Sequence, residues 1–245
     1  MSLTESMDRM RDSRALLEGL IDEPSRLGPD WQPIRLLADD SVVGYKATGA
    51  AQAELGDTLA LLAEAKGLGL VERLDWSFRA WAFQVAIEAG LQAEVWLTPE
   101  PETYGTACPP RLIGAFGRGR RELKVVAEVP SDAYEDIGAL TRAVTEYRGW
   151  GWRIASRDVG DLPDPAGKLD AISPDVVMLD LALPGRSAAR PAEGVRQVLD
   201  WTARSGATLM ALGVDSPSRR TEAEALGGTL GRGRMLGDPG RLPVG

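Results

Sequence analysis

The sequence predicts an α/β protein that folds as one (β/α)8 barrel of the TIM type, preceded by an N-terminal helical extension. The chain has 245 residues, which is the usual size of a single α/β barrel. Strand-like and helical patterns alternate along most of this length, and a break separates the first helix from the rest. These observations favour one large core over two smaller domains.

The helical extension is predicted over residues 1–26. Ser2 and Glu5 have the S-x-x-E spacing of a capping box, and apolar residues then recur near helical spacing. Residues 22–33 contain three prolines and a glycine, a composition that ends a helix. We therefore expect the barrel to occupy residues 27–245.

Apolar stretches of strand length follow the break, and amphipathic helical patterns lie between them. Repeated strand-helix alternation favours a parallel sheet covered by helices, and about eight such units favour closure into a barrel. The expected strands are residues 34–37, 42–47, 93–97, 123–129, 152–156, 176–181, 208–214 and 229–235, and the expected helices are residues 53–66, 74–89, 133–147, 192–204 and 219–225.

Three other segments have a structural interpretation. Residues 161–167 (DLPDPAG) follow a strand and are predicted to form a loop at one end of the barrel. Residues 117–121 (GRGRR) are expected to form an exposed basic turn in preference to a phosphate or nucleic-acid loop. Trp150 and Trp152 are expected to pack between helix and sheet in preference to forming a ligand platform.

Composition restricts the partners and the compartment. The formal charge of −8 and the pI near 4.8 oppose binding to DNA or to anionic membranes. The opening segment lacks the apolar core of a signal peptide, and no apolar run is long enough to span a membrane. Cys108 is the single cysteine, which excludes an intramolecular disulfide. We expect a cytoplasmic protein.

The chain contains no histidine. This excludes Ser-His-Asp and Cys-His nucleophilic schemes and any metal site with histidine ligands. Any acid-base or metal chemistry would have to depend mainly on carboxylates and amides.

Nine short segments of the chain together form a pattern. They are residues 31–34 (WQPI), 44–48 (GYKAT), 67–75 (GLGLVERLD), 95–99 (VWLTP), 126–129 (VAEV), 157–160 (RDVG), 174–180 (PDVVMLD), 211–215 (ALGVD) and 232–239 (RGRMLGDP). In order and spacing they resemble the motifs of the EAL-domain cyclic-di-GMP phosphodiesterases, which are YQPI, GYEAL, ETGLIxxLD, VNLSP, LEIT, DDFG, PVDxxKID, AEGVE and QGY…GRP. The 23 positions from Arg157 to Asp180 equal the family's spacing between DDFG and KID.

The resemblance implies a barrel whose active members use two divalent cations, held by carboxylates and an asparagine, to hydrolyse a phosphodiester. Glu128, Asp158 and Asp180 keep the family chemistry, and Asp215 is a shortened form of a family glutamate. The other implied site positions are substituted. They are Lys46, Trp96, Arg157, Met178, Leu212 and Arg232. We therefore expect no metal, no cofactor, no catalytic residue and no phosphodiesterase activity.

The substitutions suggest a compensation for the lost metals. Without metal ions, Glu128 and Asp158 would be partly buried, unpaired anions, which is costly. We expect Lys46 and Arg157 to neutralise them, while Trp96, Met178 and Leu212 fill the vacated volume. The alternative is that Lys46, Arg157 and Arg232 form a new pocket for an anion.

Two functions remain open at the level of the sequence. The favoured one is an inactive EAL-like regulatory module in bacterial signalling that binds a protein partner or forms a homodimer. The alternative is an effector that binds cyclic-di-GMP or a related nucleotide without cleaving it. Four residues match family positions near the nucleotide: Gln32, Asp75, Arg232 and Pro239. Against this alternative, Ala50 replaces a phosphate-contacting arginine of the family, and Trp96 is expected to obstruct the pocket.

Overall fold

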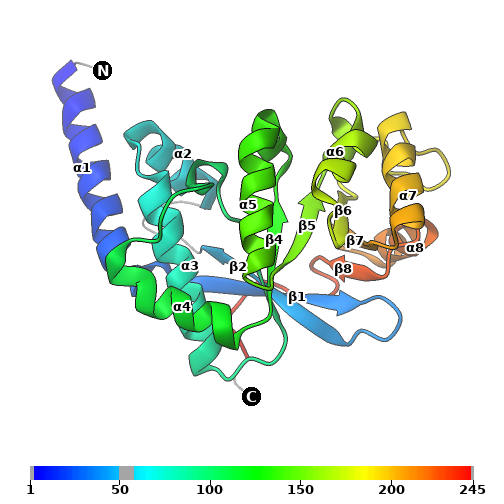
Figure 1. Cartoon of the computed structure of the whole chain (residues 1–245), viewed down its shortest axis with the longest axis horizontal. Helices are drawn as coiled ribbons and strands as arrows, with labels where there is room; N and C mark the ends of the chain where they lie inside the picture. The colour runs from blue at the N-terminus through cyan, green and yellow to red at the C-terminus, as the bar shows by residue number, and fades with distance from the viewer. Residues whose placement is uncertain (1–2, 50–57, 244–245) are drawn as a thin grey trace.

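The computed structural model describes residues 3–49 and 58–243 and confirms the predicted barrel (Figure 1). Within these residues eight strands close in sequence order into a single barrel, and helices surround it. The strands are β1 (Pro29–Leu36), β2 (Val42–Gly49), β3 (Glu94–Leu97), β4 (Val125–Val129), β5 (Arg153–Arg157), β6 (Val176–Asp180), β7 (Thr208–Leu212) and β8 (Leu230–Arg232).

The expectation of a fully parallel sheet was wrong for one strand. Strands β2 to β8 are parallel, but β1 runs antiparallel to both of its neighbours, β2 and β8. The connection from β1 to β2 is a tight turn in which Asp40 has a positive φ and Ser41 donates its amide to the Asp39 carboxylate. A turn this short joins only antiparallel strands, because a parallel crossover needs about a dozen residues.

The N-terminal helix α1 (Leu3–Asp22) contacts the barrel. Leu17, Leu20 and Ile21 are buried in one apolar cluster with residues of α2 (Thr58–Leu68) and α3 (Val71–Glu88). Figure 1 places α1 beside α3 at one side of the molecule. The described C-terminal half of α1 is therefore packed on the barrel. Ser2, the first residue of the expected capping box, lies outside the described residues.

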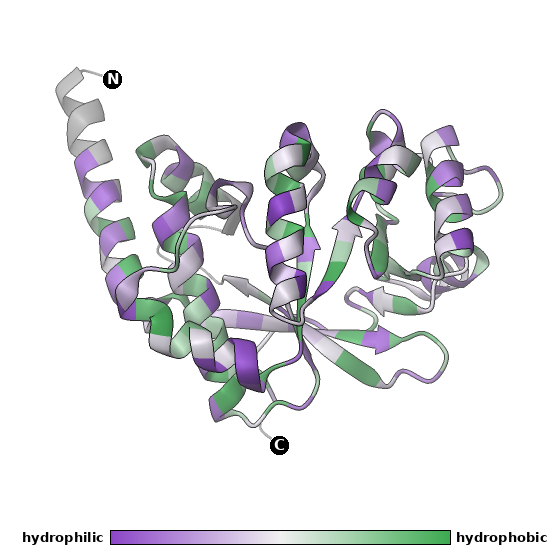
Figure 2. Cartoon of the chain, viewed as in Figure 1, coloured by the Kyte–Doolittle hydropathy of each residue, from purple (hydrophilic) through white to green (hydrophobic). Residues whose placement is uncertain are grey.

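The remaining helices follow their strands around the barrel. They are α4 (Ile113–Glu122), α5 (Ile137–Gly149), α6 (Pro165–Ile172), α7 (Glu193–Ser205) and α8 (Pro217–Ala225). Hydrophilic and hydrophobic residues alternate along α5 and α7, as amphipathic helices require (Figure 2). The first residues of the helix expected at 53–66 lie outside the described residues.

Of two segments expected to be turns or loops, the first is helical and the second is helical only from Pro165 onward. Residues 117–121 lie inside α4, where Gly119 packs so closely against Phe83 that a side chain would not fit. Residues 161–167 run into α6, which begins at Pro165 and is capped by the Asp164 carboxylate. Proline in the first turn and aspartate at the N-cap both favour a helix start, so the sequence itself contained the signal for the beginning of α6.

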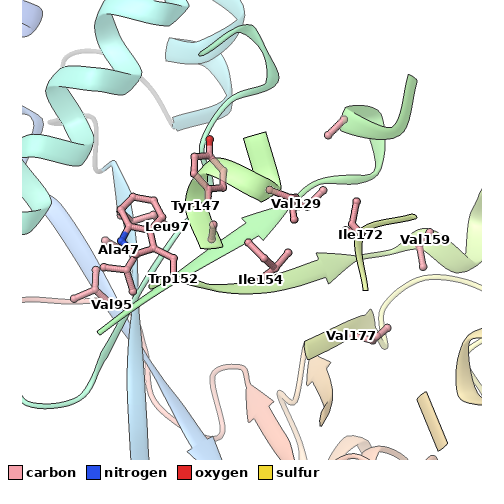
Figure 3. Packing of buried hydrophobic residues seen from close by; sticks show 14 of the residues in the cluster. Ala47, Val95, Leu97, Val129, Tyr147, Trp152, Ile154, Val159, Ile172 and Val177 are labelled. Atoms are coloured by element: carbon pink, nitrogen blue, oxygen red, sulfur yellow. The ribbon is translucent and has the colours of Figure 1, made fainter. Parts of the chain in front are cut away.

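Two apolar layers hold the barrel together. Outward-facing strand residues such as Leu97, Val129 and Ile154 pack against the helices, with Tyr147 and Trp152 among them (Figure 3). Trp152 is buried and Trp150 is half-buried, and both contact Phe116 and Tyr147. A separate cluster, which includes Ile34, Trp96, Val126, Met178 and Met210, fills the barrel interior. No helix among the described residues is long and apolar enough to cross a membrane.

Candidate functional site at the barrel mouth

Four side chains form an ion cluster at the carboxyl ends of the parallel strands, the barrel mouth. Glu128, at the end of β4, is 1% exposed. Its two carboxylate oxygens accept from different cations: Lys46 Nζ lies 3.0 Å from one and Arg232 Nη1 lies 3.1 Å from the other. Thr98 donates to the first oxygen at 3.1 Å and also accepts from Lys46. We call these four residues the mouth cluster.

The mouth cluster sets the charge state of its members. Burial alone would raise the pKa of Glu128, but the charges of Lys46 and Arg232 outweigh it and hold that pKa at about 2. Burial lowers the pKa of Lys46 to about 8, although the Glu128 carboxylate opposes this, because Arg232 and Arg157 add repulsion. At neutral pH the cluster therefore contains one carboxylate and two cations.

Arg157 and Asp158 form a second, more exposed pair beside the cluster. Arg157 Nε lies 3.5 Å from the Asp158 carboxylate, and the Arg157 side chain is 38% exposed. Asp158, which has a positive φ, also accepts the backbone amide of Asp180. Asp180 in turn accepts from the amide of Ala182. The carboxylates of Asp158 and Asp180 therefore each contact a cation or a hydrogen-bond donor.

The two cations expected to neutralise Glu128 and Asp158 do lie against them: Lys46 pairs with Glu128, and Arg157 pairs with Asp158. Arg232 is a further cation on Glu128, which this expectation did not include. Arg232 comes from β8, on the opposite side of the barrel from β4, so its long side chain crosses the interior. Asp215 takes no part: it is exposed and binds the amide and side chain of Arg234.

Trp96, Met178 and Leu212 belong to the apolar cluster that fills the barrel interior. The expectation that Trp96 obstructs the mouth was wrong. Its indole nitrogen donates to Glu94, the first residue of β3, so the ring leans toward the amino-terminal end of the barrel. Gly44 makes this possible, since a Cβ atom there would lie 2.7 Å from that nitrogen.

A cavity of about 270 Å³ opens beside the mouth cluster. Asp75 and Arg232 line it, whereas Gln32 and Pro239 do not: Gln32 donates to the carbonyl of Gly237, and Pro239 is exposed. Ala50 lies outside the described residues. We call this space the mouth cavity, and its described walls are Leu27, Lys46, Ala47, Thr48, Gly49, Leu61, Leu62, Leu74, Asp75, Phe78, Thr98, Glu100, Arg157 and Arg232.

Two carboxyl groups on the cavity wall are held differently. Asp75 is buried and pairs with Arg79, one helical turn further along α3, at 2.8 Å. Burial raises the pKa of Asp75 in spite of this partner. Glu100 is half-buried, and burial together with the nearby charges of Asp75 and Glu102 raises its pKa to about 7.

The residues at the mouth do not fit the pair of divalent cations implied by the sequence resemblance. Hard divalent cations need several oxygen ligands free to coordinate them. Both oxygens of Glu128 instead face cations, and Asp158 faces a guanidinium. Across residues 3–49 and 58–243, no group of three or more acidic or cysteine side chains is arranged to hold a metal ion.

Comparison with known families accounts for this architecture. A profile of the EAL domain matches residues 13–239. The chain belongs to the EAL domain family. The match begins inside α1.

Solved EAL structures share the fold of this EAL domain at low sequence identity. The Xanthomonas citri FimX EAL domain, in complex with c-di-GMP, has a TM-score of 0.81 at 16% identity, covering 99% of this chain and 100% of that one. The PaMucR phosphodiesterase in its c-di-GMP complex has a TM-score of 0.72 at 18% identity, covering 90% and 94%. A standalone EAL protein from Vibrio cholerae O395, in its c-di-GMP bound form, has a TM-score of 0.70 at 19% identity, covering 87% and 92%. No sequence among curated proteins matches the chain.

Three residues of the EAL domain's mouth were missed at the level of sequence. Thr98 lies in the VWLTP segment and completes the mouth cluster. Arg79 follows Asp75 by four residues on a helix, a spacing at which an ion pair is expected. Glu100 gave no signal, because its position on the cavity wall depends on the loop after β3.

Proposed function

We propose that this EAL domain is non-catalytic and acts as a regulatory binding module. The observation that carries the proposal is the pairing of Glu128 with two cations, Lys46 and Arg232. In the two-metal chemistry of active EAL domains, the corresponding carboxylate would have to coordinate a cation. An ammonium and a guanidinium at these positions supply charge balance but no Lewis acid and no activated water.

The test is a hydrolysis assay on the purified protein. Cyclic-di-GMP is incubated with the protein and Mn²⁺ or Mg²⁺, and the products are separated by chromatography, with an active EAL domain as the positive control. We expect no linear product and no Mn²⁺-dependent rise in melting temperature. Turnover that requires metal and is lost in Glu128→Gln would overturn the proposal.

A second candidate is that the module binds a nucleotide without cleaving it. The observation in its favour is the mouth cavity, where Asp75 and two arginines face one space beside the mouth cluster. Similar folds crystallised with c-di-GMP make that molecule the first nucleotide to test. Titration calorimetry without metal, on the native chain and on Arg157→Gln, would detect such binding.

A protein partner or a homodimer stays a prediction. Leu17, Leu20 and Ile21 of α1 are buried against α2 and α3, so these three side chains are not free to bind another chain. Light scattering coupled to size exclusion measures the mass in solution. A dimer mass that persists on dilution would support the homodimer, and a monomer mass would exclude it.

A further inference from the structure

The guanidinium groups at the mouth have donors that the protein does not use. Arg232 reaches Glu128 through Nη1, and Arg157 reaches Asp158 through Nε. Neither guanidinium makes another side-chain hydrogen bond or ion pair within residues 3–49 and 58–243. Both residues line the mouth cavity, and the Arg232 side chain is only 12% exposed. A nearly buried cation with unused donors at a cavity wall favours an anion inside.

The charges around the mouth cavity leave a positive excess. Lys46, Arg157 and Arg232 are opposed by Glu128 and Asp158. The other two acidic residues reduce this excess without cancelling it. Asp75 is paired with Arg79, and the pKa of Glu100 at about 7 leaves its carboxyl group about half ionised at neutral pH. The cavity is therefore electrostatically suited to a ligand with one negative group.

Part of the cavity wall is apolar. Leu27 precedes β1, Leu61 and Leu62 come from α2, and Leu74 and Phe78 come from α3. Leu62 and Phe78 are only half-buried although they are large and apolar. Covering their exposed surface would contribute about 25 cal/mol for each Å² removed from water.

The size of the cavity sets an upper limit on the part of a ligand that fits inside. Its volume of about 270 Å³ lies near the lower end of the range for small-molecule sites, roughly 300–1,000 Å³. This corresponds to about nine water-sized groups, at about 30 Å³ for each water in the liquid. A short apolar chain or a single ring system fits, together with one anionic group.

We propose that the mouth cavity binds a small amphiphilic anion. Its carboxylate or phosphate group accepts hydrogen bonds from Arg157 and Arg232, and its apolar body lies against Leu62 and Phe78. The inference rests on the metal-free mouth of the proposed function, because a divalent cation there would need the carboxylates that the arginines occupy. It adds the chemical class of the ligand.

Octanoate and octan-1-ol are a matched pair of probes, because they share the chain and differ in charge. Saturation-transfer NMR on the intact protein, with titration to obtain Kd, measures both. We expect saturable octanoate binding and at least tenfold weaker binding of octanol, since a hydrogen bond to a charged group contributes about 1.5–3 kcal/mol. Equal affinity for the two probes would overturn the anion site.

Two variants test separately the arginine and the apolar residues that line the mouth cavity. Arg157→Gln and Leu62→Gln should each weaken octanoate binding about tenfold, whereas Arg118→Gln should not change it. Arg118 is an exposed arginine on α4 that pairs with Glu122 and does not line the cavity. Arg157 and Leu62 are both partly exposed, so thermal melting should show that their variants fold. Binding that is unaffected by both cavity variants would contradict the proposal.

Competition identifies the anion's chemistry and keeps the two proposals distinguishable. Octyl phosphate should displace octanoate, whereas inorganic phosphate at the same concentration should not, because it lacks the apolar body. If phosphate competes equally, or if only cyclic-di-GMP binds, the amphiphile inference fails while the non-catalytic assignment stands. Metal-dependent cleavage of cyclic-di-GMP would instead overturn the proposed function.

Discussion

The two ends of the barrel each carry a glutamate that pairs with an arginine, but the two glutamates differ in the number of cations around them. At the amino-terminal end, Glu94 accepts from Arg153 at 2.7 Å and from the Trp96 indole at 3.2 Å. At the mouth, Glu128 faces Lys46 and Arg232, with Arg157 nearby. In the ion pairs of these two glutamates, Glu94 has one cationic partner, whereas Glu128 has two.

The largest effect should follow from removing each glutamate in turn. Glu128→Gln leaves Lys46 and Arg232 buried without their anion, which should lower the free energy of unfolding by about 3–5 kcal/mol. Glu94→Gln should cost about 1 kcal/mol, because its partner Arg153 is 41% exposed and solvent screens the pair. Urea denaturation followed by circular dichroism measures both. Equal losses would mean that the two ends do not differ as described.

Lowering the pH should also distinguish the contribution of Glu128 to stability from that of Glu94. The folded pKa of Glu128 is about 2, below its ordinary value of 4.5, so the unfolded chain binds the proton more readily between these values. The stability from Glu128 is present above pH 4.5 and is lost as pH falls toward 2, by about 3 kcal/mol in all. Unfolding curves from pH 6 to pH 2 should show this slope in the native chain and in Glu94→Gln. A slope that persists in Glu128→Gln would assign it to other groups.

The charge excess at the mouth should also respond to alkali. The pKa of Lys46 is about 8 and that of Glu100 about 7, so raising the pH from 6 to 9 removes a positive charge and adds a negative one. Octanoate affinity should fall by about fivefold over this range. In Glu100→Gln, the decrease in octanoate affinity between pH 6 and pH 8 should be smaller. An affinity independent of pH would contradict this. The charged groups that face the two titrating residues are Glu128, Arg232, Arg157, Asp75, Glu102, Asp132 and Lys66.

The smallest effect concerns the indole at the amino-terminal end. Trp96→Phe removes the hydrogen bond to Glu94, which should contribute about 1 kcal/mol to the coupling between these residues. A double-mutant cycle with Glu94→Gln isolates this term from the volume lost when the indole is replaced. If the losses of stability in the two single variants add up to the loss in the double variant, the hydrogen bond between Trp96 and Glu94 contributes nothing measurable.

Strand order and closure of the barrel could be predicted because alternating apolar patterns depend on local spacing. The direction of β1 could also have been predicted: four residues separate the expected strands at 34–37 and 42–47, too few for a parallel crossover. Helix α4 could not, since Gly114, Gly117 and Gly119 give it low intrinsic propensity. Its formation depends on burying Phe116 and on the close contact of Gly119 with Phe83, which are tertiary effects.

At the candidate site, the sequence predicted which charges would gather but not that Arg232 would join Glu128. The order of the strands places Lys46, Glu128 and Arg157 at one end of the barrel. Whether Arg157 or Arg232 reaches Glu128 depends on side-chain rotamers and on the width of the interior. Two flexible arginines on different strands cannot be distinguished by spacing alone, and Arg232 is the one that crosses.

The reversed direction of β1 has a mechanical consequence. Because Pro29 pairs with Gly49, β1 begins at the mouth, and the segment from α1 reaches the barrel there and not at the opposite end. Leu27, between α1 and β1, is at once a member of the cluster that holds α1 and a wall of the mouth cavity. Displacing α1 by a single helical turn, about 5.4 Å, would carry that wall with it. The antiparallel direction of β1 therefore couples the position of α1 to the shape of the mouth cavity.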